Sequence, residues 1–163
     1  MYQRILLPTD GSDTAESAID HCLAIADRFE AVVHVLHVVD ASQPDQNQGG
    51  QRFDQVGTDQ FSEMEALTEI GEDAIRVVRS EADARGVDTV GHVVPGDPAR
   101  AIADYVENEE IDLIVMGSRG HRGVKRALLG SITERVKTLV TVPVLVTSVG
   151  ETHSETESSA DVG

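Results

Sequence analysis

Residues 117 to 133, which read GSRGHRGVKRALLGSIT, decide the fold of this chain. An apolar run over residues 111–116 precedes them and predicts a buried strand, and a helix is expected to begin at Ser131. Glycines allow a backbone to approach a ligand closely, and the first turn of a helix leaves N–H groups without partners. A strand that leads through glycines into a helix N-terminus is therefore typical of a phosphate-binding loop. A solvated surface loop that binds nothing is the alternative.

The same stretch forms the basic part of an acidic chain. The protein has 29 acidic and 13 basic side chains and a formal net charge of −16. Six of the basic residues lie close together, namely Arg119, Arg122, Lys125, Arg126, Arg135 and Lys137. The overall charge argues against binding to nucleic acids or to anionic membranes. It suggests adaptation to a salt-rich cytosol, as in a halophile, where salt screens the repulsion between carboxylates.

Length and composition indicate one globular domain. At 163 residues, with 40% apolar and 3% aromatic residues, the chain has enough aliphatic side chains for a core. The single cysteine, Cys22, lies in an apolar helical stretch and is predicted to belong to this core. The N-terminus lacks the pattern of a secretory signal, and no apolar run approaches about 18 residues, so we expect a cytoplasmic protein without a membrane partner.

Apolar periodicity predicts alternating strands and helices. The expected strands cover residues 2–8, 31–39, 89–94, 113–116 and 142–146, and the expected helices cover 13–29, 61–85, 98–108 and 131–139. The second helix is predicted to bury Met64, Leu67, Ile70, Ala74, Val77, Val78 and Ala82. This order predicts an α/β fold with a single-domain, doubly wound, five-stranded parallel sheet. The globular domain should span residues 1–148, with a mobile loop at about 40–59, and residues 149–163 should form an acidic disordered tail.

Doubly wound sheets bind ligands outside the carboxyl ends of their strands, where the winding reverses. The loops at 9–12 and 117–130 would meet at that point if the strands lie in the order 3-2-1-4-5. An acidic side chain beside a phosphate loop suits a ribose hydroxyl or a metal ion that rides on the phosphates, and Asp10 is placed for that role. On its own, an aspartate such as Asp10 is more often just a turn residue or a helix cap.

The glycine spacing distinguishes this loop from other nucleotide-binding loops. No GxxxxGKS or GxxxxGKT pattern fits the chain, and the first strand runs into PTDG at residues 8–11 instead of a glycine triad. The pattern that fits is G-x2-G-x9-G-S, formed by Gly117, Gly120, Gly130 and Ser131. With this motif the chain resembles the universal stress protein family, in its nucleotide-binding branch. The resemblance extends over residues 1–148 and includes 8–12 (PTDGS), 36–40 (LHVVD), 94–98 (VPGDP), 112–120 (DLIVMGSRG), 128–131 (LLGS) and 142–146 (VPVLV).

The resemblance implies a Rossmann-like, adenine-nucleotide-hydrolase-like sheet in the order 3-2-1-4-5. It also implies binding of ATP, AMP or another adenine nucleotide, with Mg²⁺ carried by the nucleotide. By position, Asp10 would contact the ribose or the metal ion, and Val38 would present its peptide group to adenine. The implied site residues are Pro8, Thr9, Asp10, Val38, Met116, Gly117, Arg119, Gly120, Gly130, Ser131, Ile132 and Thr133. The family further implies a homodimer formed through the last strand, 142–146, and an apolar edge strand needs such a partner.

The function expected from these features is that of a dimeric, nucleotide-dependent stress-response or signalling module with unidentified protein partners. A slow ATPase or phosphotransferase of the same fold is one alternative, and a dimeric scaffold that no longer binds nucleotide is another. His34 and His37 lie three residues apart in a strand, so they face opposite sides and cannot act together, and His121 is expected to be solvated. We therefore predict no catalytic residues.

Overall fold

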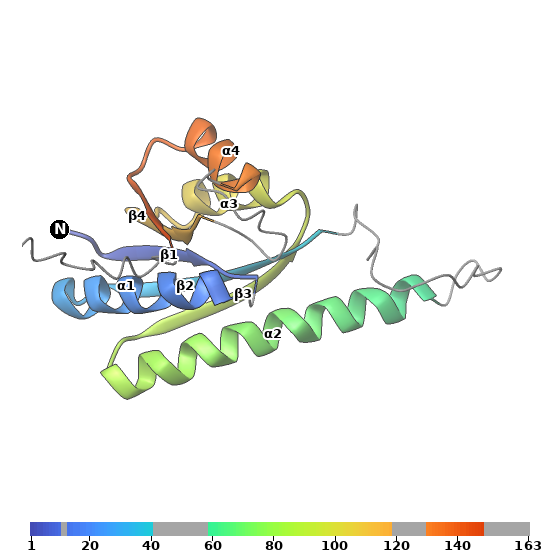
Figure 1. Ribbon diagram of the computed structural model, residues 1–163, viewed down its shortest axis with the longest axis horizontal. Helices are drawn as coiled ribbons and strands as arrows, with labels where there is room; N and C mark the ends of the chain where they lie inside the picture. The colour runs from blue at the N-terminus through green and yellow to red at the C-terminus, as the bar shows by residue number, and fades with distance from the viewer. Residues whose placement is uncertain (11–12, 41–58, 119–129, 149–163) are drawn as a thin grey trace, which may run out of the picture.

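The computed structural model describes residues 1–10, 13–40, 59–118 and 130–148, which form a sheet covered by helices (Figure 1). The strands are β1 (Arg4–Pro8), β2 (Val32–Val39), β3 (Thr89–Pro95), β4 (Leu113–Gly117) and β5 (Val144–Thr147), and the helices are α1 (Asp13–Phe29), α2 (Asp59–Arg85), α3 (Pro98–Asn108) and α4 (Ser131–Leu139). All five strands are parallel, in the order β3-β2-β1-β4-β5. The α/β class, the alternation of elements and the strand order are confirmed. The expected loop at 41–58 and the tail at 149–163 lie outside the described residues.

The two faces of the sheet pack against different helices because successive strand residues point to opposite sides. In β1, Ile5 and Leu7 belong to a core cluster with residues of α1 and α2. Leu6, between them, belongs to a second cluster with residues of α3 and α4. Figure 1 shows the two helix pairs on opposite sides of the sheet. Both faces are therefore covered, as expected for a parallel sheet.

β1 is the central strand of the sheet and pairs on both sides. β1 is paired with β2 as far as Pro8 and Leu36, and on its other side with β4 from Ile5 and Leu113. β5 begins at Val144, two residues later than expected, since Pro143 has no N–H group to donate to a ladder. Along the described residues, every helix is too short or too polar to span a bilayer.

The buried face of α2 differs from the predicted one. Met64, Ile70 and Val77 were expected in the core but have 37%, 55% and 50% of their area exposed. The buried positions are Gly71, Ala74, Ile75, Val78 and Ala82. Apolar residues occur on both sides of this helix, so periodicity alone does not select the face. Contact with the sheet selects the side that contains Gly71, where the absence of a side chain lets the helix approach closely.

Buried polar groups lie on both faces of β2, as its alternation requires. His34 faces α3, where its Nδ1 lies 2.9 Å from the hydroxyl oxygen of Tyr105. Burial lowers the pKa of His34 and raises the pKa of Tyr105 to about 12, so both are neutral near pH 7. Cys22 is fully buried, as predicted, and burial raises the pKa of its thiol to about 12. A thiol with that pKa is a packing group, not a nucleophile.

Candidate nucleotide site

The candidate site lies at the carboxyl ends of β1 and β4, the two neighbouring strands from which the chain leaves in opposite directions. From β1 the chain crosses through α1 to β2, and from β4 it crosses through α4 to β5. Ile5 pairs with Leu113 and Leu6 with Ile114, and the same register continued along the strands places Thr9 level with Gly117. Diverging connections of this kind leave a crevice above the strand ends.

On the β1 side, the backbone of Thr9 is held at both its peptide groups. Its N–H donates to the carbonyl of Leu36 over 2.9 Å, and its carbonyl lies 2.9 Å from Nδ1 of His37. Thr9 itself is 7% exposed. The next residue, Asp10, is half-buried and lies just beyond the end of β1. The hydrogen bonds of Thr9 therefore fix the backbone from which the Asp10 carboxylate extends.

The peptide groups of Val38 are directed toward the same crevice. The carbonyl of Leu36 points toward β1, because it accepts from Thr9, and the carbonyl of Val39 points toward β3, because it accepts from Gly96 over 3.0 Å. Peptide groups two residues apart on a strand point the same way, so those of Val38 point toward β1. The register places Val38 level with Asp10, just beyond the last paired residue of β1.

On the β4 side, three hydrogen bonds bring the end of the strand, the start of α4 and the end of β5 together. The N–H of Ser118 donates to the carbonyl of Thr147 over 2.8 Å, and the N–H of Gly130 donates to the carbonyl of Ser118. The hydroxyl of Thr133 donates to the carbonyl of Gly117 over 3.2 Å. The two ends of the glycine-rich stretch are thus adjacent, while Arg119 and Gly120 between them lie outside the described residues.

The first turn of α4 offers peptide donors to an anion. Gly130 is the N-cap residue, and a glycine has no side chain that would cap the helix. The first intrahelical bond runs from the N–H of Glu134 to the carbonyl of Gly130 over 3.1 Å. The N–H groups of Ser131, Ile132 and Thr133 precede that bond, at the positive end of the helix dipole. This arrangement suits a phosphate group.

Several predicted site residues contribute differently from the expectation. Thr133 was predicted as a site residue, but its side chain is 2% exposed and its hydroxyl bonds to the carbonyl of Gly117. The N–H of Gly130 is likewise engaged, by Ser118. Met116 is buried in the core beside α3 and α4, whereas Pro8 ends β1. Thr133 therefore joins β4 to α4, and its peptide group alone is left for the crevice.

Two described members of the basic cluster are paired with acidic residues. The Arg135 guanidinium donates to both carboxylate oxygens of Asp97, over 2.9 and 2.8 Å. Asp97 also caps α3 by accepting from the N–H of Arg100 over 3.2 Å. These bonds, that from Arg135 above all, hold the pKa of the Asp97 carboxyl below its usual value. Lys137 lies 3.6 Å from Glu134. The Asp97–Arg135 pair links α4 to the start of α3. The cluster of basic residues in the sequence did not predict this role of Arg135.

Direct metal binding finds no support among the described residues, where no group of three or more histidine, cysteine or acidic side chains is placed to hold an ion.

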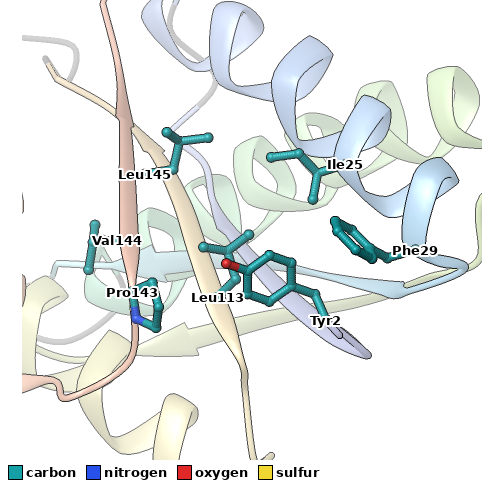
Figure 2. Close-up of a pocket in the computed structure, with 7 residues that line it drawn as sticks. All are labelled: Tyr2, Ile25, Phe29, Leu113, Pro143, Val144 and Leu145. Atoms are coloured by element: carbon teal, nitrogen blue, oxygen red, sulfur yellow. The ribbon is translucent and has the colours of Figure 1, made fainter.

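A hollow of about 320 Å³ lies well apart from the crevice, between α1 and the β4–β5 edge (Figure 2). Its lining is apolar and consists of Tyr2, Ile25, Phe29, Leu113, Pro143, Val144 and Leu145. The rings of Tyr2 and Phe29 pack edge to face, with centroids 5.2 Å apart. The hollow contains none of the predicted nucleotide-site residues, and it flanks the edge strand of the sheet.

Known proteins are similar to this chain in sequence and in fold. A universal stress protein of Methanocaldococcus jannaschii is 37% identical over 148 residues, which cover 90% of this chain and 82% of the relative. A second such protein of the same archaeon is 33% identical, with 90% and 94% covered. Its solved structure matches with a TM-score of 0.79 over 92% of this chain and 98% of the other.

More distant structures share the fold. A universal stress protein in complex with cAMP matches at 23% identity with a TM-score of 0.64, over 91% and 98% of the two chains. An Arabidopsis thaliana member with AMP bound matches at 14% identity with a TM-score of 0.63, over 95% and 97%. The model of the universal stress protein family matches residues 1–148. With its sheet order and this match, the chain belongs to the universal stress protein family.

Proposed function

We propose that this protein binds an adenine nucleotide, ATP foremost, in the crevice between β1 and β4. Binding would act as a switch in a dimeric cytoplasmic stress-response or signalling module. The observation that carries the proposal is the first turn of α4, where the N-cap Gly130 makes no side-chain hydrogen bond and which is fastened to the end of β4, the strand beside β1. Phosphates would bind the N–H groups of Ser131, Ile132 and Thr133.

The remaining parts of a nucleotide have matching groups in the crevice. The Asp10 carboxylate is suited to accept from ribose hydroxyls or to share Mg²⁺ with the phosphates, and the Val38 peptide is suited to the adenine edge. A bound triphosphate with its Mg²⁺ would supply the negative charge that this helix terminus neutralises. The relatives with cAMP and AMP support an adenine nucleotide as the ligand class.

We favour a binding role over rapid hydrolysis. Phosphoryl transfer to water needs a group that orients the water, besides the phosphate cradle. Among the described polar side chains near the crevice, the His37 ring is turned to Thr9, the Thr133 hydroxyl is turned to Gly117, and the Asp10 carboxylate is assigned to the ribose or to Mg²⁺. Slow turnover remains the alternative activity, and a higher rate of phosphate release by wild type than by a Gly130→Asp variant would favour it.

We also infer that a second copy of this chain pairs with β5. The N–H of Ile114 donates to the carbonyl of Pro143, and the N–H of Ser118 donates to the carbonyl of Thr147. The peptide groups of the odd-numbered residues from 143 to 147 therefore point toward β4. The peptide groups of Val144 and Val146 consequently point away from the sheet. Leu145 is 38% exposed beside the apolar hollow of Figure 2. An apolar edge strand next to an apolar hollow fits self-association.

Calorimetric titration of ATP, with Mg²⁺ and high salt, tests the nucleotide proposal. Salt is needed because a net charge of −16 repels a polyanion at low ionic strength. We expect saturable binding of one ATP per subunit. The absence of binding at millimolar ATP would leave the scaffold as the better account of the protein.

The Gly130→Asp variant is the sharpest test of the site. Aspartate is a favourable N-cap and suits the extended backbone of Gly130, with φ −53° and ψ 148°, so the fold should be kept. Its carboxylate would occupy the donors of the first turn and repel phosphate, and we expect affinity to fall about 100-fold or more. Gly130→Asn is the matched control, since it has similar size and capping ability without charge. Equal ATP affinity of the Asp variant and wild type would show that the phosphate lies elsewhere.

A further inference from the structure

The His37 side chain forms a contact that links β2 to the candidate site. It is 9% exposed, and its Nδ1 lies 2.9 Å from the carbonyl oxygen of Thr9. A carbonyl oxygen only accepts hydrogen bonds, so the proton of the ring is on Nδ1 and the ring donates. His37 is thus a donor within the sheet, aimed at the residue before Asp10.

This donor acts where the ladder between β1 and β2 ends. The N–H of Thr9 already bonds to the carbonyl of Leu36. In an uninterrupted parallel ladder, the N–H of Val38 would then meet the carbonyl of Thr9. The His37 ring donates to that carbonyl. Val38, whose peptide we assign to adenine, lies level with Asp10 in the same register, so the ring fixes the backbone beside the adenine contact.

On its other side, the His37 ring lies against Gly71 of α2. A methyl group at position 71 would lie 2.5 Å from Cδ2 and 2.9 Å from Cγ of the ring, and 3.2 Å from Cγ2 of Val93. Distances below 3 Å are sterically forbidden, and a ring held between a helix and a strand has little freedom to retreat. Any side chain at position 71 would therefore push the ring away from Thr9.

We propose that His37 is a positioning residue for the nucleotide site: its ring holds the Thr9–Asp10 turn in place, and Gly71 provides the space that seats the ring. This proposal rests on the nucleotide-binding function proposed above. It assigns roles to two residues outside the implied site, and it makes the packing of α2 a determinant of nucleotide affinity.

A pair of substitutions at position 37 isolates the hydrogen bond. His37→Leu removes the donor at similar size, whereas His37→Asn keeps an N–H donor at the δ position. The loss of one such bond is expected to raise the Kd for ATP about tenfold in His37→Leu. His37→Asn should recover most of that loss. Equal affinities of the Leu and Asn variants would overturn the proposal. That result would mean that position 37 acts only by filling space, since only the Asn side chain can donate a hydrogen bond to Thr9.

A second pair separates the ring from general packing of α2. A methyl group at Gly91 of β3 would lie 2.5 Å from Cγ2 of Ile75, so Gly91→Ala strains the same helix without touching His37. Both Gly71→Ala and Gly91→Ala should lower the melting temperature. Only Gly71→Ala should weaken ATP binding, and its effect on affinity should vanish in a His37→Leu background. Equal losses of affinity in both alanine variants would contradict the proposal.

Amide exchange without nucleotide distinguishes failure of this proposal from failure of the proposed function. The Thr9 N–H should exchange faster in His37→Leu than in wild type, and close to the wild-type rate in His37→Asn. If wild type binds no ATP, the nucleotide function falls, and the exchange rates still decide whether His37 holds the turn. If wild type binds ATP while all three proteins exchange and bind alike, the function stands and the role of His37 falls.

Discussion

At the residue scale, Thr133 joins β4 to α4 through its side chain and keeps its peptide N–H for the crevice. Its hydroxyl donates to the Gly117 carbonyl from a nearly fully buried position. Replacement by valine preserves the shape but leaves that carbonyl without this donor. Thr133→Val should lower the free energy of unfolding by about 1–3 kcal/mol, measured by urea denaturation.

Thr133→Ser provides the control, because it keeps the hydroxyl. It should retain the hydrogen bond and lose only the contribution of one methyl group, about 1 kcal/mol. ATP affinity should fall less in Thr133→Val than in Gly130→Asp, since the helix N–H groups remain. A valine variant that is fully stable but no longer binds ATP would instead place the hydroxyl against the phosphate.

How far individual residues can be predicted depends on the distance along the chain to their partners. Asp10 and Gly130 follow from local rules, because a turn after a strand and a glycine before a helix can be recognised within a few residues. The partner of His37 is Thr9, 28 residues away, and that of Arg135 is Asp97, 38 residues away. Neither pair has a local signal. Arg135 was consequently grouped with the basic loop, although the structure pairs it with a helix cap.

At the scale of elements, α2 shows where periodicity is insufficient. The helix has apolar residues on its exposed side as well as its buried side, and Ile70 and Gly71 are neighbours with opposite environments. A large side chain was expected to mark the core, yet the closest approach to the sheet occurs at the glycine. The signal that identifies such a face is a small residue at the crossing point, together with Ala74 and Ala82 at helical spacing.

The edge strand β5 carries the element-scale prediction. Val146→Pro removes a peptide N–H that points away from the sheet and leaves the β4 ladder, which uses alternate residues, in place. We expect this variant to be monomeric in analytical ultracentrifugation, at concentrations where wild type is dimeric. Val146→Ala keeps the N–H and should remain dimeric. A dimeric proline variant would place the interface elsewhere, and a monomeric wild type would remove the dimer from the proposed function.

At the scale of the whole molecule, the order of elements was predictable because few topologies accommodate it. Strict alternation of strands and helices requires parallel strands with right-handed crossovers, and the crevice follows from where the winding reverses. What alternation leaves undetermined is the strand order, which came from the resemblance and is confirmed by the pairing of β1 with β2 and β4. The expected position of the crevice thus follows from topology, whereas the adenine nucleotide that we propose for it came from the resemblance.

The net charge of −16 leads to a prediction about the same whole molecule. Repulsion among carboxylates should destabilise the fold at low salt, and ions at 1 M screen charges within about 3 Å. We therefore expect the free energy of unfolding, measured with urea, to rise from 0.1 M to about 2 M KCl. Equal stability at both concentrations would contradict the expected adaptation to salt.

A triple variant of α2 separates charge repulsion from general effects of KCl. Glu65, Glu69 and Glu72 are exposed and lie one helical turn apart, where like charges destabilise a helix by about 0.2–0.5 kcal/mol per pair. Replacing all three with glutamine removes this repulsion and should raise stability at 0.1 M KCl more than at 2 M. The salt dependence of the variant should accordingly be shallower than that of wild type. Parallel curves would assign the effect of salt to the exclusion of KCl from the protein surface, which acts on both proteins alike.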